Sequence, residues 1–237
     1  MINLMLGDCL ERMKEIPDGS VDLILADLPY GTTACKWDTI IPFEPLWEQY
    51  KRVCKPNAAI VLTASQPFTS ALVMSNIEMF KYCWVWDKVN RNTGSLTANS
   101  RPMRRHEDVC VFYSKQPSYH KVPCGVPPVR GGHVGGHGEY VGGAIRKHVS
   151  APSDKTPCSV LAFPGMNSDG AYHPTQKPVA LMEYLIKTYT NEGETVLDNC
   201  MGSGTVGVAC KNLNRKFIGI EKDETYFKIA QDRIAAI

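Results

Sequence analysis

The chain of 237 residues lacks long hydrophobic runs and carries almost no net charge. No apolar stretch approaches the roughly 20 residues that a membrane helix needs, and the first ten residues lack the basic and apolar regions of a secretory signal. The formal net charge is only +2. Any affinity for nucleic acid must therefore come from local patches rather than from the molecule as a whole. We predict a cytoplasmic protein that does not bind membranes.

Paired cysteines are also missing. The nine cysteines are scattered and include no Cys-x-x-Cys pair, which favours free thiols in a reducing compartment. His133 and His137 lie four residues apart among glycines, with Cys124, His148 and Cys158 in the same region. Their spacing fits no familiar zinc site, and so many glycines disfavour a helix that could hold them. We therefore predict no metal.

The chain alternates apolar, strand-like runs with helical patterns. Strands are predicted at residues 2–6, 20–26, 58–63, 82–86, 108–113, 195–197 and 216–220, and helices at 9–16, 45–53, 67–76, 178–189, 205–213 and from 224 onward. This alternation predicts an α/β fold with a largely parallel sheet and helices on both faces. The length allows one such domain plus an insertion.

Asp27-Leu28-Pro29-Tyr30 directly follows the apolar run 20–26. In open α/β sheets, ligands bind beyond the carboxyl ends of strands. The Asp27 carboxylate and the Leu28 carbonyl offer hydrogen-bond acceptors, Pro29 stiffens the turn, and the Tyr30 ring can stack on a planar base. The stretch suits an exocyclic amine on a base, although an isolated tetrapeptide of this kind is more often a turn with a capping Asp and a packed Tyr.

A glycine-rich segment at residues 198–205 joins a predicted strand to a predicted helix, where a ligand can approach the backbone closely. Glu221 ends the next predicted strand, and an acid there can accept hydrogen bonds from ribose hydroxyls. The run from Gly202 to Gly207 satisfies the Gly-x-Gly-x-x-Gly pattern. This segment alone therefore leaves a dinucleotide and S-adenosylmethionine both open.

Together with His173-Pro-Thr-Gln-Lys-Pro178, these two segments resemble the three hallmarks of the S-adenosylmethionine-dependent DNA amino-methyltransferases, in the order of their β subgroup. His106-Glu107 is also similar to a motif of that family. Leu28 departs from the family, which usually has Pro at this position. The resemblance implies a Rossmann-like methyltransferase sheet with a loop-rich insertion. It also implies that Asp27, Leu28, Pro29 and Tyr30 are catalytic.

The same resemblance implies S-adenosyl-L-methionine as the cofactor. Its expected binding residues are Asp8, Asp27, Lys177, Asp198, Asn199, Cys200, Gly202, Ser203, Gly204, Thr205 and Glu221. Lys177 and Thr175 are expected near the methionine end. From the residues alone, Asp8 also suits a helix N-cap, and both roles can hold together.

Pro and Gly become dense between residues 115 and 172, where six Lys or Arg face three acidic residues. We predict a catalytic half at 1–114, a target-recognition insertion at 115–172 and a cofactor-binding half at 173–237. A disordered linker is the alternative for the middle segment. We favour target recognition because apolar and aromatic residues could still anchor the segment, namely Tyr119, Tyr140, Val141, Ile145, Val160, Leu161 and Phe163. The residues expected to contact DNA are Arg91, Arg101, Arg104, Arg105, Arg130, Arg146 and Lys147.

The predicted reaction is methyl transfer to N6 of an adenine flipped out of double-stranded DNA. In the resembling family, Asp at the first position of the tetrapeptide goes mostly with adenine. The alternatives are N4 of cytosine, an RNA adenine, a glutamine side chain of a protein, and an inactive DNA-binding relative. The resemblance predicts a bacterial or phage origin and leaves a homodimer and a cognate restriction endonuclease open as partners.

Overall fold

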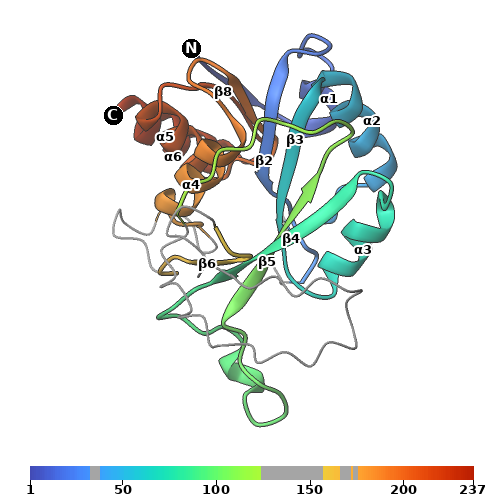
Figure 1. The fold of residues 1–237 in the computed structure, drawn as a ribbon. Coiled ribbons are helices and arrows are strands. Elements are labelled where there is room, and N and C mark those ends of the chain that lie inside the picture. The colour runs from blue at the N-terminus through green and yellow to red at the C-terminus, as the bar shows by residue number, and fades with distance from the viewer. Residues whose placement is uncertain (33–37, 124–156, 166–171, 173–175) are drawn as a thin grey trace, which may run out of the picture.

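The computed structural model describes residues 1–32, 38–123, 157–165, 172 and 176–237. Its centre is an eight-stranded sheet in the order β1-β8-β7-β2-β3-β5-β4-β6 (Figure 1). The strands are β1 (Ile2–Leu6), β2 (Val21–Asp27), β3 (Cys54–Ala64), β4 (Phe80–Asp87), β5 (His106–Phe112), β6 (Val160–Ala162), β7 (Thr195–Asp198) and β8 (Lys216–Glu221). The helices are α1 (Cys9–Met13), α2 (Phe43–Val53), α3 (Phe68–Ser75), α4 (Val179–Tyr189), α5 (Thr205–Asn212), α6 (Glu224–Ala235) and the short 3-10 helix η1 (Ser95–Thr97).

The sheet is largely parallel. Five of the seven pairings between described strands are parallel, and the two antiparallel pairings both involve β5. A hairpin over residues 88–105 connects β4 to β5, and such a connection makes neighbouring strands antiparallel. The predicted α/β architecture is therefore confirmed, with one reversed strand.

Helices cover both faces of the sheet, and each face has its own hydrophobic core. Because successive side chains of a strand point to opposite faces, Leu23 and Leu25 of β2 join one core while Ile24 and Ala26 join the other. The first core contains apolar residues of α4, α5 and α6, and the second contains those of α1, α2 and α3. A strand buried on both sides reads as a continuous apolar run, which is why β2 stands out in the sequence.

Strand β6 was not predicted. Its three residues pair in parallel with β4, so that Trp86 lies beside Leu161 in the register. Leu161 is fully buried in the first core, and Trp86 Nε1 donates a hydrogen bond to the Phe163 carbonyl at 2.8 Å. The three residues of β6 lie in the segment where Pro and Gly are dense, so no alternation of strands and helices marks them in the sequence. The downstream part of the proposed insertion is thereby attached to the sheet.

The upstream part of that insertion packs against α4. His120 N donates to the Thr188 carbonyl at 2.8 Å, and Tyr184 Oη donates to the Val122 carbonyl at 3.0 Å. The three predicted DNA-contacting residues Arg130, Arg146 and Lys147 lie outside the described residues. The division at residues 115 and 172 stays a prediction. Among the described helices, none is long and apolar enough to cross a membrane.

Candidate active site

The carboxyl ends of four adjacent strands, β1, β8, β7 and β2, border a cavity of about 720 Å³. Residues at or just after the ends of parallel strands meet at one edge of a sheet, so Asp8, Asp27, Asp198 and Glu221 all line this cavity. Of the predicted catalytic and cofactor residues that the structure describes, all but Gly204 line it. The structure therefore brings together side chains that lie as far apart in the chain as Asp8 and Glu221.

The glycine-rich loop between β7 and α5 owes its shape to two left-handed residues. Gly202 has φ +50° and Gly204 has φ +78°, conformations that favour glycine. A Cβ on Gly204 would lie 3.0 Å from the Ala230 Cβ of α6, and one on Gly207 would lie 2.4 Å from Ile234 Cδ1. Gly204 and Gly207 therefore allow the close packing of α6 on this segment, while Gly202 faces the cavity.

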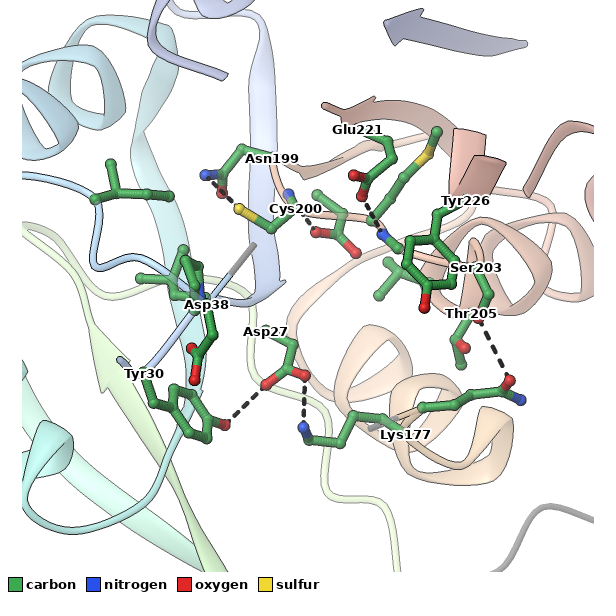
Figure 2. A pocket seen from close by; sticks show the side chains of 18 of the residues that line it. Asp27, Tyr30, Asp38, Lys177, Asn199, Cys200, Ser203, Thr205, Glu221 and Tyr226 are labelled. Carbon is green, nitrogen blue, oxygen red and sulfur yellow. Dashed lines mark hydrogen bonds and ion pairs between the residues drawn. The ribbon is translucent and has the colours of Figure 1, made fainter. Parts of the chain in front are cut away.

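Glu221 holds this loop against the end of β8. Its carboxylate accepts hydrogen bonds from the backbone N–H groups of Gly202, Lys222 and Asp223, each at 2.8 Å. Figure 2 shows Glu221 at the wall of the cavity with one of these bonds. Burial raises the pKa of Glu221 above its ordinary value, while these N–H groups act in the opposite direction. Glu221 lines the cavity and also fixes the loop that forms one wall of it.

Three other predicted cofactor residues have partners inside the protein. Burial raises the pKa of Asp198 well above its ordinary value, and its carboxylate accepts a hydrogen bond from Cys200 N at 3.0 Å. Asn199 Oδ1 accepts a hydrogen bond from Tyr50 Oη of α2 at 2.6 Å. Asp8 accepts from Leu10 N at 2.9 Å, so it is the N-cap of α1. Because Asp8 is also exposed to the cavity, its second predicted role remains open.

Asp27 ends β2 at the centre of the cavity, between Tyr30 and Lys177 (Figure 2). Tyr30 Oη donates to Asp27 Oδ1 at 2.8 Å, and Thr63 Oγ1 of β3 donates to the same oxygen. Lys177 Nζ lies 2.5 Å from Asp27 Oδ2. Leu28 is buried in the second core, and this packing holds the turn where the resembling family usually has Pro.

Tyr30 is only partly available as a stacking surface. Its ring stacks on that of Phe68, with the centroids 5.1 Å apart and the planes at 26°. Asp38 accepts hydrogen bonds from Gly31 N at 2.8 Å and Thr32 N at 2.9 Å, and so fixes the backbone that follows Tyr30. The sequence did not indicate this function for Asp38. The predicted stacking on a base stays a prediction.

Four charged side chains form a chain that begins at Asp27; Lys177 and Lys88 are buried, and Asp27 and Glu107 are partly buried. Lys177 lies between Asp27 and Glu107, with its Nζ 3.5 Å from Glu107 Oε2, and Lys88 Nζ lies 2.6 Å from Glu107 Oε1. Burial acts to raise the pKa of Glu107, but the two ammonium groups outweigh it and lower that pKa. Burial acts to lower the pKa of Lys177, but the two carboxylates outweigh it and raise that pKa.

Sequence reasoning missed most of this chain of charges. It placed Lys177 near the methionine end of a cofactor, treated Glu107 only as part of a family resemblance, and gave Lys88 no function. The structure places Lys177 beside Asp27, and Thr175 lies outside the described residues. The ends of β4 and β5 bring Lys88 and Glu107 together because Trp86 lies opposite Glu107 in the antiparallel register.

Four predicted DNA-contacting arginines belong to the hairpin at residues 88–105, where the backbones of Thr93 and Arg104 exchange hydrogen bonds. Arg104 donates to Ser65 Oγ at 2.7 Å, Arg105 donates to Asp87 Oδ1 at 2.8 Å, and Arg91 donates to the Gly165 carbonyl at 3.4 Å. Arg91 and Arg104 also line the cavity, and Arg101 is exposed. Within the described part of the chain, no group of three or more His, Cys, Asp or Glu could hold a metal ion.

Comparison with known proteins gives consistent results. The family model described as DNA methylase matches residues 21–232. The type II methyltransferase M.HpaI of Haemophilus parainfluenzae is 28% identical over 246 residues, covering 98% of this chain and 73% of the relative. M.BglII of Bacillus subtilis is 29% identical over 242 residues, covering 94% of this chain and 66% of the relative.

Solved structures share the fold. The crystal structure of the M1.HpyAVI–SAM complex has a TM-score of 0.68 and 27% identity, covering 99% of each chain. The cytosine-N4-specific PvuII DNA methyltransferase has a TM-score of 0.73, covering 98% of this chain and 86% of that one; at 16% identity it is evidence of the fold alone. The match to the family model over most of the sequence shows that this chain belongs to the DNA methylases, the S-adenosylmethionine-dependent family that modifies N6 of adenine or N4 of cytosine.

Proposed function

We propose that this protein transfers a methyl group from S-adenosylmethionine to N6 of an adenine flipped out of double-stranded DNA. The observation that carries the proposal is the position of Asp27 and Leu28. They follow the carboxyl end of β2 in the same cavity that Glu221 and the Gly202 loop border. An acceptor pair for an amine therefore lies beside a loop suited to a nucleoside cofactor.

The residues of the cavity fit S-adenosylmethionine. A volume of about 720 Å³ lies within the range of small-molecule sites, about 300–1,000 Å³. Asp8 and Glu221 can accept hydrogen bonds from ribose hydroxyls and the adenine amine, and the carboxylates around the cavity suit a cationic ligand. When bound, S-adenosylmethionine supplies an electrophilic methyl group on a sulfonium.

Asp27 and Leu28 act on the amine of the target base. The nitrogen of such an amine is a poor nucleophile because its lone pair is delocalised into the ring. If the Asp27 carboxylate and the Leu28 carbonyl accept its two N–H bonds, the nitrogen becomes more pyramidal and its lone pair is oriented. This is catalysis by positioning and electrostatic stabilisation. Tyr30 and Thr63 orient the carboxylate through Oδ1.

The product identifies the base. The Asp27 carboxylate could accept hydrogen bonds from the amine of either adenine or cytosine. The assignment to adenine depends on the family resemblance, in which Asp at this position goes mostly with adenine. We expect N6-methyladenine after unmethylated genomic DNA is incubated with the protein and S-adenosylmethionine, digested to nucleosides and separated by mass spectrometry. N4-methylcytosine as the main product would overturn the assignment. Parallel incubations with RNA and protein test the remaining substrates, and transfer to none of them would indicate an inactive relative.

The basic hairpin and the segment 115–172 are proposed to hold DNA. The ion pair between Arg105 and Asp87 is exposed, and such pairs contribute only about 0–1 kcal/mol. Arg105 can therefore exchange this contact for a phosphate. Arg104 has a neutral hydroxyl as its closest partner. A homodimer and a restriction endonuclease partner stay predictions.

We expect Arg104→Gln with Arg105→Gln to flatten the salt dependence of DNA binding. Each phosphate contact that is lost lowers the slope of log K against log salt concentration by about 0.9. Fluorescence anisotropy with duplex DNA at several salt concentrations measures the slope. Lys228→Gln is the matched control, because Lys228 is an exposed cation paired with Asp232 on α6. A slope unchanged from that of the control would mean that neither arginine contacts phosphate.

A further inference from the structure

One oxygen of Glu107 lacks the partner that a buried carboxylate oxygen ordinarily has. Among the described residues Oε2 accepts no hydrogen bond, while Oε1 receives Lys88 at 2.6 Å. Lys177 Nζ lies 3.5 Å from Oε2. An unsatisfied buried acceptor is costly, and this one lies next to the residue that neutralises Asp27.

Asp27 shows the complementary situation, because both of its oxygens are already occupied. Oδ1 accepts from Tyr30 and Thr63, and Oδ2 is 2.5 Å from Lys177 Nζ. Oδ1 already accepts two hydrogen bonds, so a target amine that donates to Asp27 has to share Oδ2 with the ammonium of Lys177. Tyr30 and Thr63 are held by their ring packing and strand position, so Lys177 is the group that can withdraw.

We propose that Lys177 is a movable positioning residue, which shifts its ammonium from Asp27 to Glu107 when the target amine binds. The proposal rests on the proposed function. A displacement of under about 1 Å would bring Nζ from 3.5 Å to hydrogen-bond distance of Glu107 Oε2. The shift satisfies Oε2 and opens Asp27 Oδ2, and the charge chain keeps equal numbers of carboxylates and ammonium groups.

Lys88 holds the receiving carboxylate in place. It binds Glu107 Oε1, its own backbone N–H donates to the Arg105 carbonyl at 3.0 Å, and its ammonium lies 5.3 Å from the centre of the Trp86 ring. Oε1 of Glu107 is therefore held by Lys88, while Oε2 has no hydrogen-bond donor among the described residues. A static ion pair would instead place the ammonium of Lys177 at good distance from both carboxylates at once.

Glu107→Gln tests the proposal because it keeps the shape of the side chain and removes the receiving charge. Lys177 should then remain on Asp27. We expect single-turnover methyl transfer to unmethylated genomic DNA to fall about 100-fold, the order expected for a misplacement of about 1 Å at a reacting centre. The affinity for S-adenosylmethionine, measured by calorimetry, should stay within about twofold, since the cofactor loop is unchanged.

The double variant Glu107→Gln/Lys177→Met distinguishes a movable cation from a structural one. In Glu107→Gln the ammonium of Lys177 stays on Asp27, and the second substitution removes this ammonium. At mildly alkaline pH the double variant should therefore transfer the methyl group faster than Glu107→Gln alone. A purely structural role predicts the opposite, because a second buried partner is lost. Lys177→Arg is a third test. The guanidinium of Arg can bind the carboxylates of Asp27 and Glu107 at the same time, so we expect a folded but slow enzyme.

Asp22→Asn is the matched control for general loss of a buried charge. Asp22 pairs with Lys55 at 2.6 Å at the start of β2, away from the cavity. We expect its transfer rate to match that of the wild type. A double variant slower than Glu107→Gln, or a Lys177→Arg variant as fast as the wild type, would overturn the inference while leaving the proposed function intact. No transfer by the wild-type protein would overturn both.

Discussion

Asp27→Ala should abolish methyl transfer and leave most of the affinity for S-adenosylmethionine intact. Asp27 also belongs to the predicted cofactor set, but its carboxylate acts chiefly on the reacting amine. Removing one preorganised group at a reacting centre costs about 10²–10³ in rate, and here the counter-ion of the buried Lys177 is lost as well. We therefore expect a loss of about 10³-fold or more.

Single-turnover transfer of a radiolabelled methyl group measures the rate, and calorimetry measures the cofactor affinity. Asp27→Asn is the matched variant, since it keeps one acceptor oxygen but offers an amide donor where the target amine needs an acceptor. It should be as inactive as Asp27→Ala. If rate and affinity fell in parallel, the main function of Asp27 would be to hold the cofactor rather than the amine.

Glu221→Ala should weaken S-adenosylmethionine binding more than any other single change in the cofactor loop. The substitution removes the acceptor of three backbone N–H groups, including that of Gly202. The N–H of Gly202 is partly buried, whereas those of Lys222 and Asp223 are exposed and can bond to water instead. A buried donor left without a partner costs about 1–3 kcal/mol. A loss of about 1.4 kcal/mol corresponds to tenfold in affinity, so we expect a decrease of about 10- to 100-fold.

Calorimetry on Glu221→Ala and Glu221→Gln separates the two functions of this side chain. Gln keeps one acceptor oxygen for the loop but loses the charge. The affinity of Glu221→Gln for S-adenosylmethionine should therefore lie between those of Glu221→Ala and the wild type. Thermal unfolding without cofactor reports how much of the effect comes from the loop itself. Equal affinity of wild type and Glu221→Ala would remove Glu221 from the cofactor site.

The sequence predicted the layered fold because most of the strands are long apolar runs. It also predicted the edge of the sheet that carries the cavity, since Asp8, Asp27, Asp198 and Glu221 each lie at or just after the end of a strand. Strand β7 is almost as short and was predicted, because a glycine-rich loop and a helical pattern follow it. Strand β6 was missed because it lies in the segment 115–172, where Pro and Gly are dense and no helical pattern marks the neighbouring elements.

The partners of individual side chains could not be predicted from spacing. Asn199 bonds to Tyr50, 149 positions away, and Lys177 meets Asp27 across 150 positions. The Glu107 contact with Lys88 depends on the register between β4 and β5. A motif predicts which residues reach a site, whereas three-dimensional packing decides which atom faces which.

The first strand of the chain lies beside the last one. β1 is hydrogen-bonded to β8 along its whole length, and Phe217 N donates to the Met1 carbonyl at 3.0 Å. α6, which follows β8, also contacts β1. A circularly permuted chain that begins at Gln176, joins α6 to β1 by a linker and ends after Gly165 would keep all seven strand pairings and the residues of the cavity. The order of the two halves is thus a matter of connectivity, and the same cavity can be built from either order.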